Sequence, residues 1–157
     1  MIQARRLRHA ARVVSALVVA GVIGSSGASI ANAGPQHHGT DPAATGCNQN
    51  AAQISSRGVE TPYGQVVATV QVFYSYSCQT NWIRVTGNPA GGATLKAIRT
   101  QGGAELVEVD WGTASSYSMQ VYAPGSTCIE YQVALTYASG AHYAEAYDPA
   151  RSWILVC

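Results

Sequence analysis

The chain has 157 residues, of which only 11% are charged and 16 are glycine, and its formal net charge is +1. This length and composition predict one compact β domain and exclude a charged helical bundle or a disordered chain. After Ala33, five basic residues stand against eight acidic ones, a net charge of −3. That balance excludes the basic surface of proteins that bind nucleic acid or anionic lipid.

The first 33 residues have the pattern of a secretory signal peptide. Basic residues precede an apolar run at 13–24, and small residues at 31–33 form a cleavage site. The apolar run is shorter than the roughly 20 residues that span a membrane. We therefore predict a secreted, extracellular protein with a signal peptide at 1–33, a flexible leader at 34–46 and a single disulfide-bonded β domain at 47–157.

The strongest local pattern lies between Gln65 and Val85, in the stretch QVVATVQVFYSYSCQTNWIRV. Its side chains alternate with a period of two, which is typical of a half-buried strand. One face is the predicted core face, and it consists of Val66, Ala68, Val70, Val72, Tyr74 and Tyr76. Phe73 then points outward and is exposed, and a turn at 79–81 leads into a further strand.

Aromatic residues give the best indication of function. The chain has nine Tyr and three Trp against one Lys, and Tyr and Trp suit binding surfaces because each has an apolar face and a polar group. On the further strand, Trp82 and Arg84 point away from the side of Ile83. We take Phe73, Tyr76, Trp82 and Arg84 as candidate binding residues. The alternative is that the aromatic residues pack in the core, with Trp82 under the first disulfide.

Four cysteines remain after the predicted cleavage, and their even number in an exported chain predicts two disulfides. Three connectivities are open. A strand at 51–60 followed by a turn would bring Cys47 back towards Cys78, so we favour the pairs Cys47–Cys78 and Cys128–Cys157. Each loop of this size would contribute about 3 to 4 kcal/mol to stability.

A metal site is the competing explanation for the cysteines and for two leader histidines. Neither C-x-x-C spacing nor a Cys/His cluster occurs, which argues against zinc. His37 and His38 lie beside Asp41, but a site needs a third converging ligand that the local sequence does not provide. No metal or other cofactor is predicted.

The rest of the chain reads as short strands separated by turns rich in Gly, Ser, Asn or Pro. The predicted strands are 94–100, 105–111, 116–122, 128–137, 142–147 and 153–157. Strands at this spacing indicate an all-β antiparallel sandwich or partly open barrel, stapled here by two disulfides.

Several segments resemble a known family. GTDPAATGC, VQVFYS and CQTNWIRV occur in the order found in the YjfA-type family of small secreted bacterial proteins, a domain of unknown function. The match covers Gly39 to about Val85, and SMQVYAPGS at 118–126 resembles a later segment more loosely. The resemblance implies export and a disulfide-bonded β domain, and it implies no activity. Relatives that form the extracellular part of membrane-anchored proteins with a cytoplasmic helix-turn-helix imply a sensing or binding role.

Glu108 and Asp110 belong to the only local carboxylate cluster. On a strand they share one face about 7 Å apart, a separation at which paired carboxylates can hydrolyse glycosides. The simpler interpretation is an amphipathic strand whose charged face lies in water, while Val107, Val109 and Trp111 share the other face.

Other catalytic patterns are missing from the sequence. His142 is the only histidine of the folded part, and there is no G-x-S-x-G motif, phosphate-binding loop or dinucleotide motif. We predict a non-enzymatic extracellular or cell-envelope binding domain whose partner is cell-wall glycan or an exported protein. The alternatives are a secreted hydrolase of glycan or ester substrates that uses Glu108 and Asp110, or His142, and a small inhibitor or toxin-like protein that uses an exposed loop at Cys78–Trp82.

Overall fold

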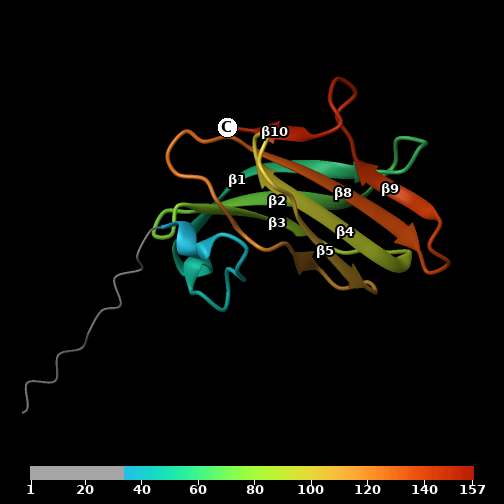
Figure 1. Cartoon of the computed structure of the whole chain (residues 1–157). Coiled ribbons are helices and arrows are strands. Elements are labelled where there is room, and N and C mark those ends of the chain that lie inside the picture. Colours follow the sequence, from blue (N-terminus) through green and yellow to red (C-terminus); the bar gives the residue numbers. More distant parts are fainter. Residues whose placement is uncertain (1–33) are drawn as a thin grey trace, which may run out of the picture.

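The computed structural model describes residues 34–157, so the predicted signal peptide lies outside the described residues. These residues form a nearly closed, barrel-like antiparallel sheet of ten strands, which confirms the all-β prediction (Figure 1). Their helices are two short 3-10 turns, η1 (Pro35–His37) and η2 (Cys47–Asn50), which lie together at one end of the barrel. Neither turn has the length or hydropathy to cross a bilayer.

The strand bounds follow the sequence prediction closely. The strands are β1 (Ala51–Glu60), β2 (Val66–Ser75), β3 (Thr80–Val85), β4 (Gly91–Thr100), β5 (Leu106–Trp111), β6 (Ser116–Tyr117), β7 (Val121–Tyr122), β8 (Ile129–Tyr137), β9 (His142–Ala146) and β10 (Ile154–Val156). Their hydrogen-bonded order is β5-β4-β8-β9-β1-β2-β3-β6, with β7 beside β3 and β10 beside β8.

Strand pairing around the barrel is sparse or missing at two positions. Strands β9 and β1 are joined by a single residue pair, Glu60 with Glu145. Strands β5 and β6 are the two ends of the hydrogen-bonded order, so the sheet is open between them. The molecule is therefore close to a two-layered sandwich, with β5, β4, β8 and β9 in one layer and β1, β2, β3 and β6 in the other.

The core lies between these layers and is built from alternate residues of the longer strands. The buried cluster includes Val70 and Val72 of β2 and Tyr131, Val133 and Leu135 of β8. Burial of each such side chain contributes about 1.5–3 kcal/mol.

The prediction of the core face of β2 is confirmed for the middle of the strand and is wrong at its ends. Ala68, Val70 and Val72 are buried, whereas Val66 at the first position of β2 is exposed. Tyr76 is exposed because it lies beyond β2, in a turn at 76–79 that precedes the predicted turn position.

The pairing of the strands explains the two disulfides, Cys47–Cys78 and Cys128–Cys157, which are both as predicted. Strands β1 and β2 pair from Ala51 with Ser75 onward, and this register brings the two cysteines just outside it together. In the same way, Ile129 of β8 faces Val156 of β10.

The segment that the sequence predicts as a flexible leader contacts the barrel through Gln120. The backbone of Gln120 accepts a hydrogen bond from Gly39 N–H at 2.8 Å and donates one to the Thr40 carbonyl at 3.0 Å. Its buried side-chain amide also donates to the hydroxyls of Thr40 and Thr45, both at 2.9 Å.

The predicted strand at 116–122 is in fact two short strands, β6 and β7. The interruption has a local cause, because the Ser118 hydroxyl accepts a hydrogen bond from Ile83 N–H at 3.1 Å in place of a backbone carbonyl. The side chain thus replaces part of the ladder along β3.

Candidate functional site

Three of the four predicted binding residues share the outward face of β2 and β3. Phe73 and Trp82 are direct cross-strand partners, and their rings stack with centroids 5.6 Å apart. Trp82 is only 5% exposed and Phe73 is half-buried, so the expectation of a freely exposed Phe73 is wrong. Arg84 lies two residues further along β3 and donates to Ser115 Oγ at 3.3 Å.

Tyr76 does not belong to this face. It lies in the turn after β2, is 60% exposed, and contacts the Tyr74 ring edge-on with centroids 5.2 Å apart. The four residues therefore do not form one continuous binding surface.

The loop Cys78–Trp82 is not the exposed contact that an inhibitor would need. Cys78, Thr80, Asn81 and Trp82 are all buried. This corrects the expectation of an exposed stapled loop, and the cause is that the chain enters β3 at Thr80.

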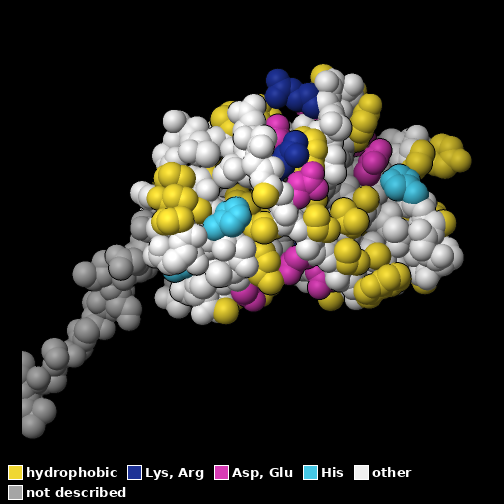
Figure 2. Space-filling model, viewed as in Figure 1, with side chains coloured by type: hydrophobic (Ala, Val, Ile, Leu, Met, Phe, Trp, Pro, Cys, Tyr) yellow, Lys and Arg dark blue, Asp and Glu magenta, His cyan; other side chains and the backbone are white. Residues whose placement is uncertain are grey.

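The apolar face of strand β5 is exposed, contrary to the sequence interpretation. Its apolar residues Val107, Val109 and Trp111 are 53%, 48% and 68% exposed, whereas its carboxylates Glu108 and Asp110 lie on the face that carries buried Lys96. The simple amphipathic interpretation is therefore only partly right: Asp110 is exposed and Glu108 is half-buried, but the apolar face is exposed as well. Figure 2 shows hydrophobic side chains interspersed with acidic ones where Figure 1 draws β4 and β5.

An acidic hollow lies at the opening between β5 and β6, with a volume of about 290 Å³. Its lining residues are Asp41, Glu108, Asp110, Ser115, Ser116, Tyr117 and Met119. It is the place where the leader, β5 and β6 meet, and it holds both carboxylates that the sequence singles out.

Two side chains that line this acidic hollow, Glu108 and Tyr117, have raised pKa values. Burial raises the pKa of Glu108, while the positive charge of Lys96 opposes that rise. Desolvation and the negative charge of Asp41 raise the pKa of Tyr117, whose hydroxyl donates to the Asp41 carboxylate at 3.3 Å. Lys96 Nζ contacts the Asp110 carboxylate and donates to Ser116 Oγ at 3.2 Å.

Sequence reasoning missed Lys96, Asp41 and Tyr117 as partners of the two carboxylates. Lys96 is the only lysine of the chain and occurs in the otherwise apolar run TLKAI, which was the available signal. Nothing in the sequence indicated that Asp41, from the leader, would approach β5.

The three histidines within residues 34–157 do not form a catalytic or metal centre with the carboxylates. His142 is half-exposed and lies 3.7 Å from Glu145, its neighbour on β9. Among the described residues, the group of possible metal ligands is His37 with Cys47 and Cys78. Both cysteines are oxidised in one disulfide, so they offer no thiolate to a metal.

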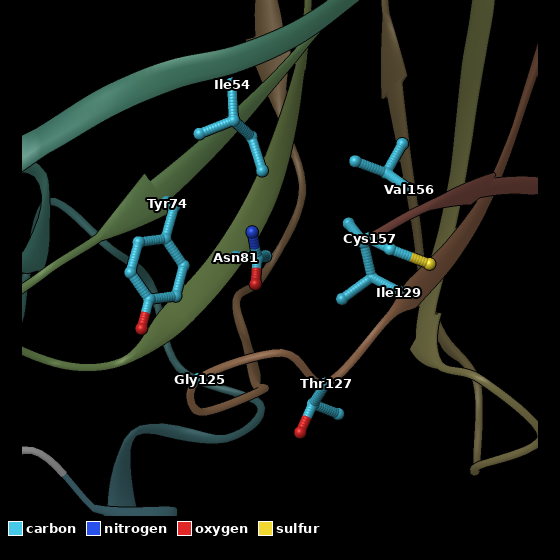
Figure 3. Close-up of a pocket in the computed structure, with 8 residues that line it drawn as sticks. All are labelled: Ile54, Tyr74, Asn81, Gly125, Thr127, Ile129, Val156 and Cys157. Carbon is cyan, nitrogen blue, oxygen red and sulfur yellow. The ribbon is translucent and has the colours of Figure 1, made fainter.

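A second hollow, of about 190 Å³, lies beside the Cys128–Cys157 disulfide (Figure 3). Its lining includes Ile54, Tyr74, Ile129 and Val156, and the polar residues Asn81 and Thr127 also line it. Its lining thus combines apolar side chains with the polar groups of Tyr74, Asn81 and Thr127.

Comparison with known proteins places the chain in a family without assigning a function. Searches of the curated proteins and of the solved structures return no match. A family model described as "Protein of unknown function (DUF2690)" matches residues 36–131, which include the leader, β1 to β7 and the acidic hollow. The YjfA-type name and the bacterial origin stay predictions. Because the family model covers more than half of the sequence, the chain belongs to the DUF2690 family.

Proposed function

We propose that the protein is a non-enzymatic, secreted binding domain whose partner is another exported protein. The observation that carries this proposal is the exposed apolar stripe on β5, defined by Val107, Val109 and Trp111. A contiguous apolar stripe in water is unfavourable and is typical of surfaces that a partner covers. Two disulfides and the predicted signal peptide support the extracellular location.

The position of the stripe favours a protein partner. Among the described strands, β5 pairs with β4 alone, so its other edge carries backbone groups that can accept an added strand. Natural edge strands are often protected by outward charges, but the charges of β5 point into the acidic hollow. Two valines beside one indole suit an extended apolar peptide, whereas a glycan site needs polar side chains next to the aromatic ring.

Site-specific crosslinking from the stripe tests this proposal. A photoreactive residue at Val109 is exposed to the exported and envelope fractions of the producing cells, and the crosslinked protein is identified by mass spectrometry. We expect one partner whose capture is lost with Trp111→Ala and kept with Tyr63→Ala, a control because Tyr63 is 97% exposed on the turn between β1 and β2.

Other results would contradict the proposal. Equal capture by the Trp111→Ala variant would remove the stripe as the contact surface. Sedimentation with cell-wall sacculi that depends on Trp111 would identify a glycan ligand instead. A crosslink between two copies of the chain would identify self-association.

A secreted hydrolase is the second candidate, because Glu108 has a raised pKa and shares the acidic hollow with Asp110. It ranks second because Asp110 is already bound by Lys96. Hydrolysis of glycan or ester substrates that is lost with Glu108→Gln and kept with Glu105→Gln would establish it. Equal activity in both variants would exclude it.

A further inference from the structure

Lys96 occupies an exceptional position. It is the only lysine of the chain, lies in the middle of β4, and is 0% exposed. Its direct cross-strand partner on β5 is Glu108, and Asp110 lies two residues further along the same face. The amine of Lys96 thus contacts the Asp110 carboxyl group, and Glu108 is the residue opposite Lys96 in the ladder.

Burying the Lys96 amine costs free energy if the amine forms only an ion pair with Asp110. A buried amine loses its hydration, and the attraction to one carboxylate does not always compensate for that loss. Asp110 is half-exposed at the acidic hollow, so its carboxyl group has one side against the amine and one side open to solvent.

We propose that Lys96 and Asp110 become joined by an intramolecular isopeptide bond, with Glu108 as the group that transfers protons. The bond forms between Lys96 Nζ and Asp110 Cγ, and one C–O bond of the Asp110 carboxyl group breaks. This modification does not depend on the proposed binding function.

The step balances without any added reactant. The ammonium group of Lys96 passes one proton directly to the Asp110 carboxylate that it contacts, which leaves a neutral amine and a neutral carboxylic acid. The amine attacks Cγ. Glu108 then takes a second proton from the nitrogen and returns it to the leaving hydroxyl, which departs as water. One positive and one negative charge disappear, and Glu108 ends in its starting state.

The surroundings of Glu108 suit this role. Burial raises its pKa, so its carboxyl group holds a proton more readily than an exposed glutamate does. The positive charge of Lys96 and the backbone of Met119 oppose this rise in the pKa of Glu108, but burial is the largest effect. The opening of the acidic hollow gives the released water a path to solvent.

The isopeptide bond would link the edge strand β5 covalently to β4. Strand β5 is held by one ladder, to β4, and an amide between Lys96 and Asp110 would add a covalent link across that ladder. The link would fix the strand that carries the exposed stripe Val107, Val109 and Trp111.

Peptide mapping of the protein secreted from the full chain tests the proposal. After reduction, alkylation and trypsin digestion, we expect the segments 85–99 and 100–151 to remain joined, with a mass one water below their sum. Trypsin is expected to leave the Lys96 bond uncut, because an acylated lysine is not a trypsin site. The map reads residues 85–151 directly, so the position of the mature N-terminus does not affect it.

Two variants identify the proton-transfer group. Glu108→Gln should be cut after Lys96 and yield segments 85–96, 97–99 and 100–151, each with full mass. Glu105→Gln should retain the link, because Glu105 contacts Arg99 and not Lys96. Wild-type protein that gives cleavage after Lys96 and segments of full mass would overturn the proposal and leave a buried ion pair. A linked Glu108→Gln protein would remove Glu108 from the reaction. The wild-type map decides the bond even if a variant does not fold.

Discussion

Phe73 of β2 and Trp82 of β3 stack almost in parallel, with ring planes inclined by 12° and centroids 5.6 Å apart. Both side chains point away from the main core, which does not include them, yet Trp82 is nearly fully buried. The stack is therefore a second, smaller hydrophobic contact on the outer side of the sheet. Two residues that the sequence suggests as ligand contacts contribute first to stability.

Removing the indole should destabilise the fold strongly. We expect Trp82→Ala to lower the free energy of unfolding by about 3–5 kcal/mol, the range for large buried aromatic side chains. A double-mutant cycle with Phe73→Leu should give a coupling energy of about 0.5–1.5 kcal/mol. Denaturant unfolding measures both, and Tyr63→Ala is the control with little effect. A Trp82→Ala variant as stable as wild type would show that the stack is not a packing contact.

The two disulfides should differ in their ease of reduction. Cys47 and Cys78 are both buried, whereas Cys157 is exposed at the end of the chain. A thiolate must reach the sulfur that it attacks, so mild reductant under native conditions should open Cys128–Cys157 first. Alkylation at intervals and peptide mapping record the order. Earlier labelling of Cys47 and Cys78 would contradict the prediction and indicate local opening at η2.

Much of the fold was accessible from the sequence because its strands alternate and its turns contain Gly, Pro or Asn. The strand β1 was predicted with its observed bounds, and the Cys47–Cys78 disulfide follows from the hairpin that β1 and β2 form. The division of 116–122 into two strands was not accessible, because it depends on the Ser118 hydroxyl meeting Ile83 of a distant strand.

The candidate site was harder to predict than the fold. A period of two separates the faces of β5 correctly but does not say which face turns towards the neighbouring buried residues, and hydrophobicity alone gives the wrong choice. Lys96 decides it, because its buried amine needs the carboxylates of β5 on the inner side. This contact joins two different strands, so the sequence of β5 by itself cannot reveal it.

Glu108 should make stability depend on pH. An acid whose pKa is raised in the folded state gives a stabilising contribution that is present below its ordinary pKa and is lost as pH rises through the folded value. Burial raises the pKa of Glu108 above 4.5, so the free energy of unfolding should fall from about pH 4 to about pH 7 by more in wild type than in Glu108→Gln. Burial is the largest cause and is present with or without the isopeptide bond.

Parallel unfolding curves at several pH values measure the difference. The control is Glu105→Gln, a half-exposed carboxylate on the approach to β5 that should retain the wild-type pH dependence. Curves for Glu108→Gln that follow wild type over the whole range would contradict a raised pKa at this residue.

Tyr131 provides the last test, because its hydroxyl is buried in the core and, among the described residues, has no hydrogen-bond partner. A buried polar group without a partner costs free energy, so Tyr131→Phe should be as stable as wild type or up to about 1 kcal/mol more stable.

Burial also raises the pKa of Tyr131 to about 12, against the opposing charge of Arg57. As pH rises from 10.0 towards 12, the unfolded state therefore loses its proton first and wild type loses stability that Tyr131→Phe keeps. Thermal unfolding at neutral and alkaline pH measures both effects, with Tyr122→Phe as the matched control, since the Tyr122 hydroxyl donates to Gln79 Oε1 at 3.4 Å. A clear loss of stability in Tyr131→Phe at neutral pH would contradict the prediction and show that this hydroxyl is hydrogen-bonded in the folded protein.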